Sequence, residues 1–319
     1  MGIKHFAFAA VFAVCAFAQG NLGGLTGTVV DTSRAAVPQA KLTLISVQTN
    51  SVYSAVSDPT GVYTIRSVPP GTYRFEVEKQ GFKRHVQENV HILTATISTL
   101  DVELSIGAVN ESITVSVASV ALQTTTPEVS TVLERRAILD LPIQVGGSGS
   151  TTAASGRRQP ENFIFLTPGV SGIPWSKNIN GSPDFSQEIL YDGISGQLAV
   201  TPGFLAQTSP PYEAVEEFKV QNSLFPAEYG RGFGVINFTL RSGSNQFHGG
   251  LFEFLRNDKL DARPFFNAAR PRVRFNEYGG SFGGPVWIPQ LYNGRDKTFF
   301  NFNYTGLRNQ PATNGTLIS

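Results

Sequence analysis

Residues 228–254 read EYGRGFGVINFTLRSGSNQFHGGLFEF, and this stretch decides how the rest of the chain is interpreted. Gly230, Gly232 and Gly234 precede residues 235–240, whose alternation of apolar and polar side chains predicts a strand. A polar turn and a second, phenylalanine-rich strand follow. A dinucleotide-binding loop would instead need a helix after its glycines, with the helix N-terminus directed at the phosphate. We therefore expect a junction between two β units.

The composition supports β architecture. The chain has 319 residues, of which 41% are hydrophobic and 15% are charged, and it contains 32 glycines and 24 phenylalanines. Glycine-rich turns combined with many aromatic residues favour sheets over helix bundles. A net charge of +1 gives no reason to expect a nucleic-acid partner.

The first 18 residues have the pattern of a signal peptide. Lys4 and His5 form a basic start, residues 6–17 are apolar, and Ala16 and Ala18 fit a cleavage site with small residues. The only cysteine, Cys15, lies in this segment, so the mature chain is expected to have no disulfide and no thiolate metal site. Because no later run of 18 apolar residues occurs, no transmembrane helix is expected.

Residues 20–106 are predicted to form a small β-sandwich. Short runs rich in β-branched and aromatic residues alternate with turn residues. The turns include Asp58-Pro59-Thr60-Gly61, in which proline fixes one backbone angle and glycine permits another. The expected strands are 25–30, 41–47, 53–57, 62–68, 72–79, 83–91 and 98–104.

This segment resembles the carboxypeptidase regulatory-like domain, a transthyretin/Ig-like β-sandwich. The resemblance is carried by residues 27–31 (GTVVD), 37–40 (VPQA), 58–63 (DPTGVY), 70–73 (PGTY) and 81–82 (GF). The family name implies no peptidase activity, and the segment contains no cluster of zinc ligands.

Residues 107–125 are predicted to be a linker that contains an extended segment. One interpretation is a further strand of the sandwich, and the other is a strand that a partner protein binds by β-augmentation. An acidic start followed by alternating β-branched residues resembles the TonB box of outer-membrane transporters. The candidate box consists of Glu111, Ser112, Ile113, Thr114, Val115, Ser116, Val117 and Ala118.

Residues 126–245 are predicted to form a second unit with no catalytic chemistry. Residues 131–142 indicate a short helix that ends before a proline. Glu213, Glu216 and Glu217 are expected on a solvated helix face, and Asp192-Gly193 is expected to be a turn. No pair of histidines has metal-ligand spacing and no serine lies in a nucleophile elbow. We therefore expect no catalytic residue, metal or cofactor, and no enzyme activity.

The last part of the chain has the pattern of membrane-spanning strands. Three stretches of about ten residues recur, at 247–256, 275–286 and 298–307. In the third, Phe300, Phe302 and Tyr304 alternate with Asn301, Asn303 and Thr305. Such alternation suits a strand with lipid on one side and a polar lumen on the other. In the first stretch the same pattern predicts that Phe252 and Phe254 share the aromatic face.

Over essentially the whole mature chain, the sequence resembles the Oar-like branch of TonB-dependent outer-membrane receptors. Specific motifs include residues 216–220 (EEFKV), 228–232 (EYGRG), 252–258 (FEFLRND), 279–285 (GGSFGGP) and 296–300 (DKTFF). The residues that match the family's plug are Leu141, Pro142, Pro168, Gly169, Asp192, Gly193, Glu228, Tyr229, Gly230 and Gly232.

The resemblance implies an order of domains. An α+β plug is expected at 126–245, with its last strand at 232–241, and the start of a transmembrane β-barrel is expected at 246–319. Family barrels use about 22 strands, whereas this chain supplies about three, so we expect the N-terminal fragment of a longer receptor.

The implied partners are a periplasmic TonB-type energy transducer, outer-membrane lipid or lipopolysaccharide, and a transported glycan, siderophore, peptide or protein. The implied location is the outer membrane. A secreted carbohydrate-binding or adhesion module is the alternative hypothesis.

Overall fold

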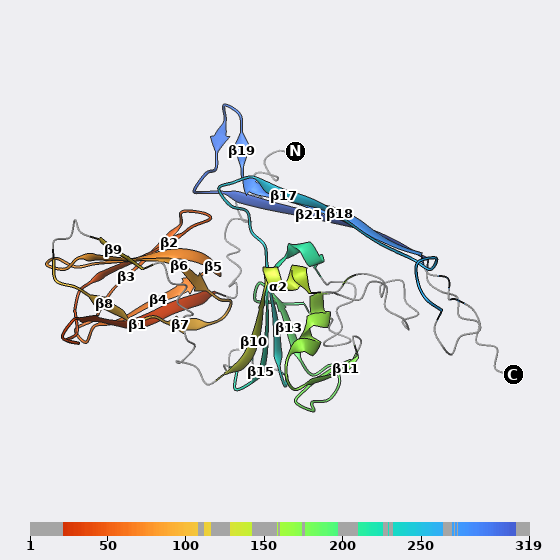
Figure 1. Ribbon diagram of the computed structural model, residues 1–319, viewed down its shortest axis with the longest axis horizontal. Helices are drawn as coiled ribbons and strands as arrows, with labels where there is room; N and C mark the ends of the chain where they lie inside the picture. Colours follow the sequence, from red (N-terminus) through yellow and green to blue (C-terminus); the bar gives the residue numbers. More distant parts are fainter. Residues whose placement is uncertain are drawn as a thin grey trace, which may run out of the picture. The chain divides into compact units, whose positions relative to one another are not determined.

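The computed structural model describes residues 22–107, 112–115, 128–141, 158, 160–173, 176–196, 210–225, 229, 232–263, 270, 272 and 274–310. The predicted signal peptide therefore lies outside the described residues. Strands predominate (Figure 1), which confirms the expected mainly β fold. The chain forms two compact units, the first containing the described residues up to Glu128 with 190–195 and 237–239, and the second containing the others.

Two sheets make up the sandwich in the first unit. One sheet has β1 (Gly23–Asp31) at its centre, paired with β4 (Val62–Val68), β7 (Ile97–Thr99) and β8 (Val102–Leu104). The other has the order β3 (Val52–Val56), β2 (Lys41–Ser46), β5 (Gly71–Glu78), β6 (Arg84–Ile92) and β9 (Ser112–Val115).

The predicted strand at 98–104 is divided into β7 and β8. Between them, the Asp101 carboxylate accepts hydrogen bonds from the backbone N–H and the hydroxyl of Thr28, at 2.8 and 2.7 Å. The Asp101 side chain thus replaces the backbone of a neighbouring strand as the hydrogen-bond partner of Thr28. β1 pairs in parallel with β7 before this point and with β8 after it.

The sandwich core is built entirely from its own residues, between Leu25 and Leu104. Tyr63 and Phe75 stack at its centre with ring centroids 5.7 Å apart, and the Tyr63 hydroxyl donates to the Leu100 carbonyl at 2.6 Å. Burial raises the pKa of the Tyr63 phenol far above its usual range, because the charged form would lose its hydration. This position therefore stays a neutral hydrogen-bond donor.

Two loops of the sandwich use the same aspartate geometry. One carboxylate oxygen of Asp58 accepts hydrogen bonds from the backbone and hydroxyl of Thr60 and from the backbone of Val62. Asp31 accepts the same set of bonds from Ser33 and Ala35. These hydrogen bonds stabilise the charged form, and they lower the pKa of both aspartates.

A second five-stranded sheet has the order β10 (Val129–Glu134), β15 (Val215–Ser223), β16 (Val235–Leu240), β13 (Glu188–Tyr191) and β14 (Ile194–Ser195). Around it lie α2 (Arg135–Asp140), the 3-10 helices η3 (Pro160–Leu166) and η4 (Tyr212–Ala214), and a hairpin of β11 (Val170–Ile173) and β12 (Ser176–Ile179).

Two sequence expectations are wrong in this region. The predicted helix at 131–142 is helical only in α2, because Thr131, Val132 and Leu133 pair with β15 as a strand. The β-branched side chains of Thr131 and Val132 suit the sheet, and the pairing outweighs the helical pattern. The expected solvated helix face at Glu213–Glu217 is instead η4 followed by β15, and both of these glutamates are buried.

The last sheet consists of three long strands, β17 (His248–Asn257), β18 (Arg274–Pro285) and β21 (Phe299–Gln310). All three predicted segments are thus strands, and they pair in antiparallel register (Figure 1). A small hairpin of β19 (Trp287–Ile288) and β20 (Tyr292–Asn293) lies in the connection between β18 and β21.

Candidate functional site

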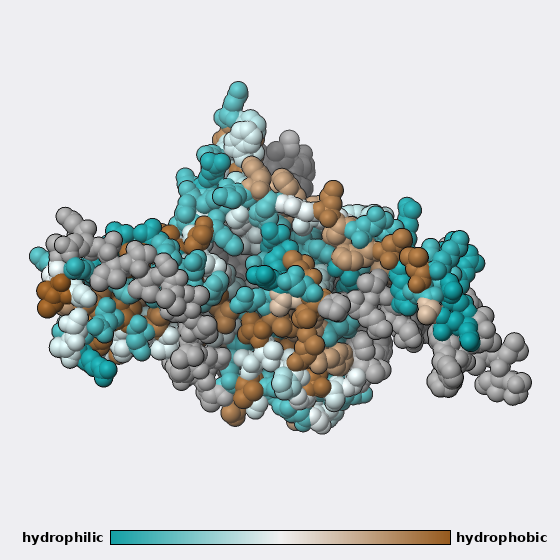
Figure 2. All heavy atoms as spheres, in the orientation of Figure 1, coloured by the Kyte–Doolittle hydropathy of each residue, from teal (hydrophilic) through white to brown (hydrophobic). Residues whose placement is uncertain are grey.

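The three-stranded sheet has one apolar face. Its register places Leu251 beside Gly280 and Tyr304, and places Phe282 beside Phe302. Leu251 is 93% exposed and Phe302 63% exposed, so these apolar side chains are left uncovered by the described residues. Figure 2 shows hydrophobic residues along this sheet. The predicted alternation in the third strand, with Phe302 and Tyr304 on one face, is confirmed by this register.

The other face of the sheet carries polar groups. Asn301, Asn303 and Thr305 lie on it, opposite the glycines and Ser281 of β18. The Asn301 amide donates to the Arg241 carbonyl at 2.7 Å. The sheet therefore separates an apolar from a polar environment, as its sequence predicts.

Phe252 and Phe254 correct the expectation for the first strand. Their register partners are Gly279 and Glu277, which puts both rings on the polar face. Leu251 and Leu255 take the apolar-face positions instead. The Phe252 ring lies where a side chain on Gly279 would be, since an added Cβ there would be 2.6 Å from a ring carbon. Because Gly279 has no side chain, the Phe252 ring can pack directly against the sheet.

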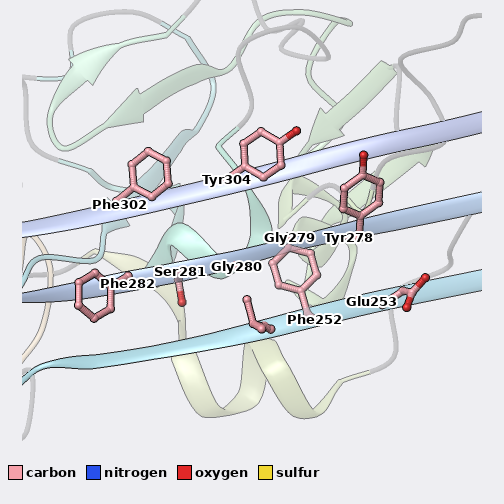
Figure 3. A pocket seen from close by; sticks show the side chains of 10 residues that line it. Phe252, Glu253, Tyr278, Gly279, Gly280, Ser281, Phe282, Phe302 and Tyr304 are labelled. Atoms are coloured by element: carbon pink, nitrogen blue, oxygen red, sulfur yellow. The ribbon is translucent and has the colours of Figure 1, made fainter.

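Figure 3 shows the region of the sheet around Gly279 and Gly280. Phe302 and Tyr304 lie beside each other on β21, with Tyr278 and Phe282 on β18. The side chains border a shallow hollow of about 790 Å³ over Gly279 and Gly280. Most of its surface belongs to the apolar face, which offers few polar groups that could orient a soluble ligand.

A buried charge cluster lies at the polar face. Arg158 forms ion pairs with Glu213, which precedes β15, and with Glu277 of β18. The Glu277 side chain is fully buried, and that of Arg158 is 5% exposed. The backbone N–H of Arg158 also donates to the Glu277 carboxylate at 3.1 Å. A buried charge is tolerated only with such partners, so these three residues depend on one another.

Aromatic rings complete the surroundings of Arg158. Its guanidinium lies over the Phe254 ring, 3.5 Å from the centroid, and over Tyr212 at 4.6 Å. Cation–π contacts of this kind strengthen when water is excluded. Burial raises the pKa of Tyr212 to about 12, against the opposing effect of the Arg158 charge. Tyr212 thus remains a neutral donor, and its hydroxyl bonds to the Ile138 carbonyl of α2.

Sequence reasoning missed this cluster. Arg158 ends a run of residues rich in glycine, serine, threonine and alanine, 145–158, which by itself indicates no functional site. Its partners Glu213 and Glu277 are 55 and 119 residues away in the chain. A cleft of about 420 Å³ beside the cluster is lined by α2, η4 and β17, and one of its lining residues is the predicted plug residue Leu141.

The predicted Pro168-Gly169 motif forms a compact polar junction. Gly169 has a φ of 82°, and a Cβ there would lie 2.3 Å from the Asn180 side-chain oxygen. Asn180 bonds through its backbone N–H to Gly169, and Asn222 bonds through its amide to Pro168. The motif therefore joins η3, the β11–β12 hairpin and β15.

The predicted Asp192-Gly193 turn is confirmed. It connects β13 and β14 as a two-residue hairpin turn in which Asp192 and Gly193 have φ values of 46° and 82°. Gly232, with a φ of 91°, lies against the Ser186 carbonyl, where a Cβ would be 2.2 Å away. Tyr229 has a helical backbone conformation, and Pro142, Glu228 and Gly230 fall outside the described residues. These motifs serve backbone geometry in the part that the structure describes.

Part of the candidate TonB box is paired in the structure. Ser112–Val115 forms β9, which runs parallel to Arg84–Gln87 of β6. The first interpretation of this segment, a further strand of the sandwich sheet, therefore holds for these four residues. Glu111, Ser116, Val117 and Ala118 lie outside the described residues.

Within the described ranges, no group of three or more His, Cys, Asp or Glu residues is placed to hold a metal ion. The helices in those same ranges are all too short or too polar to cross a membrane.

Two family models match the chain. Residues 24–105 match the carboxypeptidase regulatory-like domain, and residues 239–319 match an outer membrane beta barrel domain. The second match covers the whole two-faced sheet. These two domain types, in this order, define the class of protein that the chain resembles.

The chain is 26% identical over 294 residues to the TonB-dependent transporter Oar of Myxococcus xanthus. The alignment covers 88% of this chain and 27% of Oar, so the chain spans about a quarter of the length of that relative. The predicted resemblance to Oar-like TonB-dependent receptors is thereby confirmed, and the matches support an outer-membrane location.

Two solved structures are also similar. The siderophore receptor PirA of Acinetobacter baumannii is 20% identical, with a TM-score of 0.36, over 55% of this chain and 24% of PirA. The ferric enterobactin receptor of Pseudomonas aeruginosa is 17% identical, with a TM-score of 0.36, over 51% of this chain and 23% of the receptor.

Proposed function

We propose that the chain is the N-terminal portion of a TonB-dependent outer-membrane receptor that takes up or exports a ligand. The observation that carries the proposal is the similarity to Oar along 88% of the chain. It is supported by the register of β18 and β21, which puts Phe282, Phe302 and Tyr304 on one face and Ser281, Asn301 and Asn303 on the other. A membrane barrel wall needs these two faces.

In this proposal residues 126–245 form the plug and residues 246–319 begin the barrel. The Arg158 cluster supports the division, because Arg158 and Glu213 belong to the plug segment and Glu277 belongs to the wall. The polar wall face at Asn301, which bonds to Arg241, is the lumen face. Buried charges and amides, together with the Phe254 ring under the Arg158 guanidinium, hold the two segments together. Such contacts suit a plug that has to move, since water can replace them.

The candidate TonB box would bind its transducer as an added strand. β9 is the last strand in the order β3-β2-β5-β6-β9, so no described strand pairs with its far edge. A transducer strand can add there through main-chain hydrogen bonds. In this arrangement the sandwich serves as the platform that presents the box, and β6 keeps Ser112–Val115 extended before the partner arrives.

The test measures binding of the purified periplasmic domain of the transducer to the full chain. Ile113→Pro and Val115→Pro each remove a backbone donor from β9, and at least a tenfold loss of affinity is expected if main-chain hydrogen bonds supply the binding energy. The matched control is Val52→Pro in β3, at the opposite edge of the same sheet. Equal affinity for the Ile113→Pro variant and the unaltered chain would eliminate the box assignment.

The receptor function itself is tested by uptake. Residues 111–118 are deleted in the corresponding full-length protein, and energised ligand uptake is measured. Uptake is expected to stop while the protein still reaches the outer membrane, and unchanged uptake would refute the coupling. Glycan, siderophore, peptide and protein ligands are compared in the same assay. The proposal assigns no enzyme activity.

The alternative, a carbohydrate-binding sandwich, would present exposed aromatic rings in a row. Among residues 22–107, which the structure describes, Tyr63, Tyr73 and Phe75 are buried and Tyr53 and Phe82 are half-buried. No observation in this range favours glycan binding by the sandwich.

A further inference from the structure

The connection between β18 and β21 forms a hairpin of defined shape. Trp287 pairs with Asn293 and Ile288 pairs with Tyr292. The turn is closed by a hydrogen bond from the Leu291 N–H to the Ile288 carbonyl at 3.1 Å. Pro289 occupies its second position, and Gln290, with a φ of 64°, occupies the third. These are the features of a type II turn, which holds the tip in one conformation.

The hairpin presents large apolar side chains to solvent. Trp287 is 61% exposed, Ile288 46%, Leu291 79% and Tyr292 38%. Four such residues lie within six positions and make the tip of the hairpin apolar, which in a soluble protein indicates an interaction surface. Two of the four are Trp and Tyr, whose rings combine an apolar body with a polar edge.

The base of the hairpin is fixed to the end of the sheet. The backbone N–H of Val286 bonds to the Thr298 carbonyl at 2.9 Å, and the N–H of Gly294 bonds to the Val286 carbonyl at 2.8 Å. Asn245 and Asp296 exchange two hydrogen bonds, of 2.6 and 2.8 Å. The tip is therefore held at a constant height relative to β18 and β21.

The hairpin lies at one end of the apolar face of the three-stranded sheet. On this face, the end of the sheet next to the hairpin carries Phe282, Phe300 and Phe302. At the far end the same face carries Arg274 and Arg308. Figure 1 shows the hairpin projecting from the end of the long sheet rather than extending its strands. The apolar tip thus lies where the apolar face of the wall meets water.

We propose that the β19–β20 hairpin is an interfacial anchor. It lies in the lipid headgroup layer of the leaflet at the end of the sheet where the plug segment joins β17. The inference rests on the proposed membrane wall. Trp287 and Tyr292 are the residue types that favour the membrane–water interface, and Ile288 and Leu291 bury their side chains just below it. The exposed Arg295 and Lys297 at the base supply positive charge for anionic headgroups.

The test uses Trp287 as its own probe. The chain contains two tryptophans, so the Trp175→Phe variant of the full chain leaves Trp287 as the only one. Its emission is recorded with vesicles of phosphatidylethanolamine and phosphatidylglycerol. Separate vesicle samples carry bromine near the ester linkage or near the acyl-chain end. A blue shift with stronger quenching by the shallow bromine is expected, because the indole lies at the interface.

The controls separate the hairpin from the wall. Ile288→Glu with Leu291→Glu is expected to abolish the blue shift, whereas Val62→Glu, a matched change at an exposed sandwich position, leaves it unchanged. Co-sedimentation with the vesicles reports on the wall independently. If the chain sediments with the vesicles while Trp287 keeps its aqueous emission, the anchor proposal is overturned but the receptor proposal is not. Failure to sediment would overturn both. A shift caused by periplasmic extract but not by vesicles would indicate a protein partner and refute the lipid assignment.

Discussion

The sharpest stability prediction concerns Gly27 in β1. A Cβ at this position would lie 2.0 Å from the Leu100 carbonyl oxygen, whereas ordinary contacts of this type are at least 3.0 Å long. In the Gly27→Ala variant the Leu100 backbone therefore has to move by about 1 Å, from 2.0 to at least 3.0 Å. Glycine is required here for close strand approach, not for an unusual φ.

The cost follows from what Leu100 holds together. Its carbonyl accepts the Tyr63 hydroxyl at 2.6 Å, and its N–H donates to Thr26 at 2.8 Å. Overpacking in a core costs about 1–3 kcal/mol, and each weakened hydrogen bond costs about 1 kcal/mol. A loss of about 3 kcal/mol is expected. For a domain of this size that lowers the melting temperature by about 15 °C.

The assay is thermal unfolding of residues 20–106, followed by circular dichroism, since the core of this segment consists of its own residues. Gly81→Ala is the control, because Gly81 has a φ of 89° but no atom within 4 Å of an added Cβ. It should cost only about 1 kcal/mol of backbone strain. If Gly27→Ala destabilises the segment no more than Gly81→Ala does, close strand approach is not the reason for glycine at position 27. Tyr63→Phe should also cost less in the Gly27→Ala background, because the hydrogen bond is already weakened.

Three further predictions use titratable groups. Arg158→Met leaves Glu213 and Glu277 buried without a cation, which lowers the stability by about 3–5 kcal/mol. Proteolysis of the full chain should therefore accelerate, and an unchanged cleavage rate would refute the stabilising role of Arg158. Burial lowers the pKa of His85, so sandwich stability should fall as pH drops below about 6.5, and His85→Gln should flatten that slope. The Thr60 hydroxyl lowers the pKa of Asp58, so Asp58→Asn should reduce the melting temperature at neutral pH. At a pH below the pKa of Asp58 in the folded state the difference should vanish, because the wild-type carboxylate is itself protonated there.

The sandwich strands could be predicted because their signals are local. Asp58 and Gly61 mark a turn by their own backbone chemistry, and the predicted strand 62–68 is β4. The faces of β21 could also be predicted, since the alternation at Phe302 and Asn303 needs no information about distant residues, whereas the prediction for Phe252 in β17 was wrong. Local rules failed at Asp101, where a side chain replaces a ladder bond, and at Thr131, where strand pairing overrides a helical pattern.

The charge cluster could not be predicted, because its members are separated by 55 and 119 residues. Nothing near Arg158 distinguishes it from a solvated arginine. Glu213 and Glu217 had the pattern of a helix surface. Only the tertiary structure, in which Glu213 in η4 pairs with Arg158 and β15 pairs between β10 and β16, reveals that they are buried. Burial of a charge is a property of the tertiary structure, so the sequence alone favours the commoner exposed state.

The contrast between the two kinds of interior gives the proposed mechanism its physical basis. The sandwich is closed by an apolar core around Tyr63 and Phe75, which loses stability steeply if its packing is disturbed. In the proposed arrangement, the contact between plug segment and wall includes the buried charges of Arg158, Glu213 and Glu277, which water can solvate once they separate. A force applied through the linker at β9 would therefore meet a rigid sandwich and a plug held by exchangeable contacts. The weaker of the two is the charged one, and the plug is expected to yield there first.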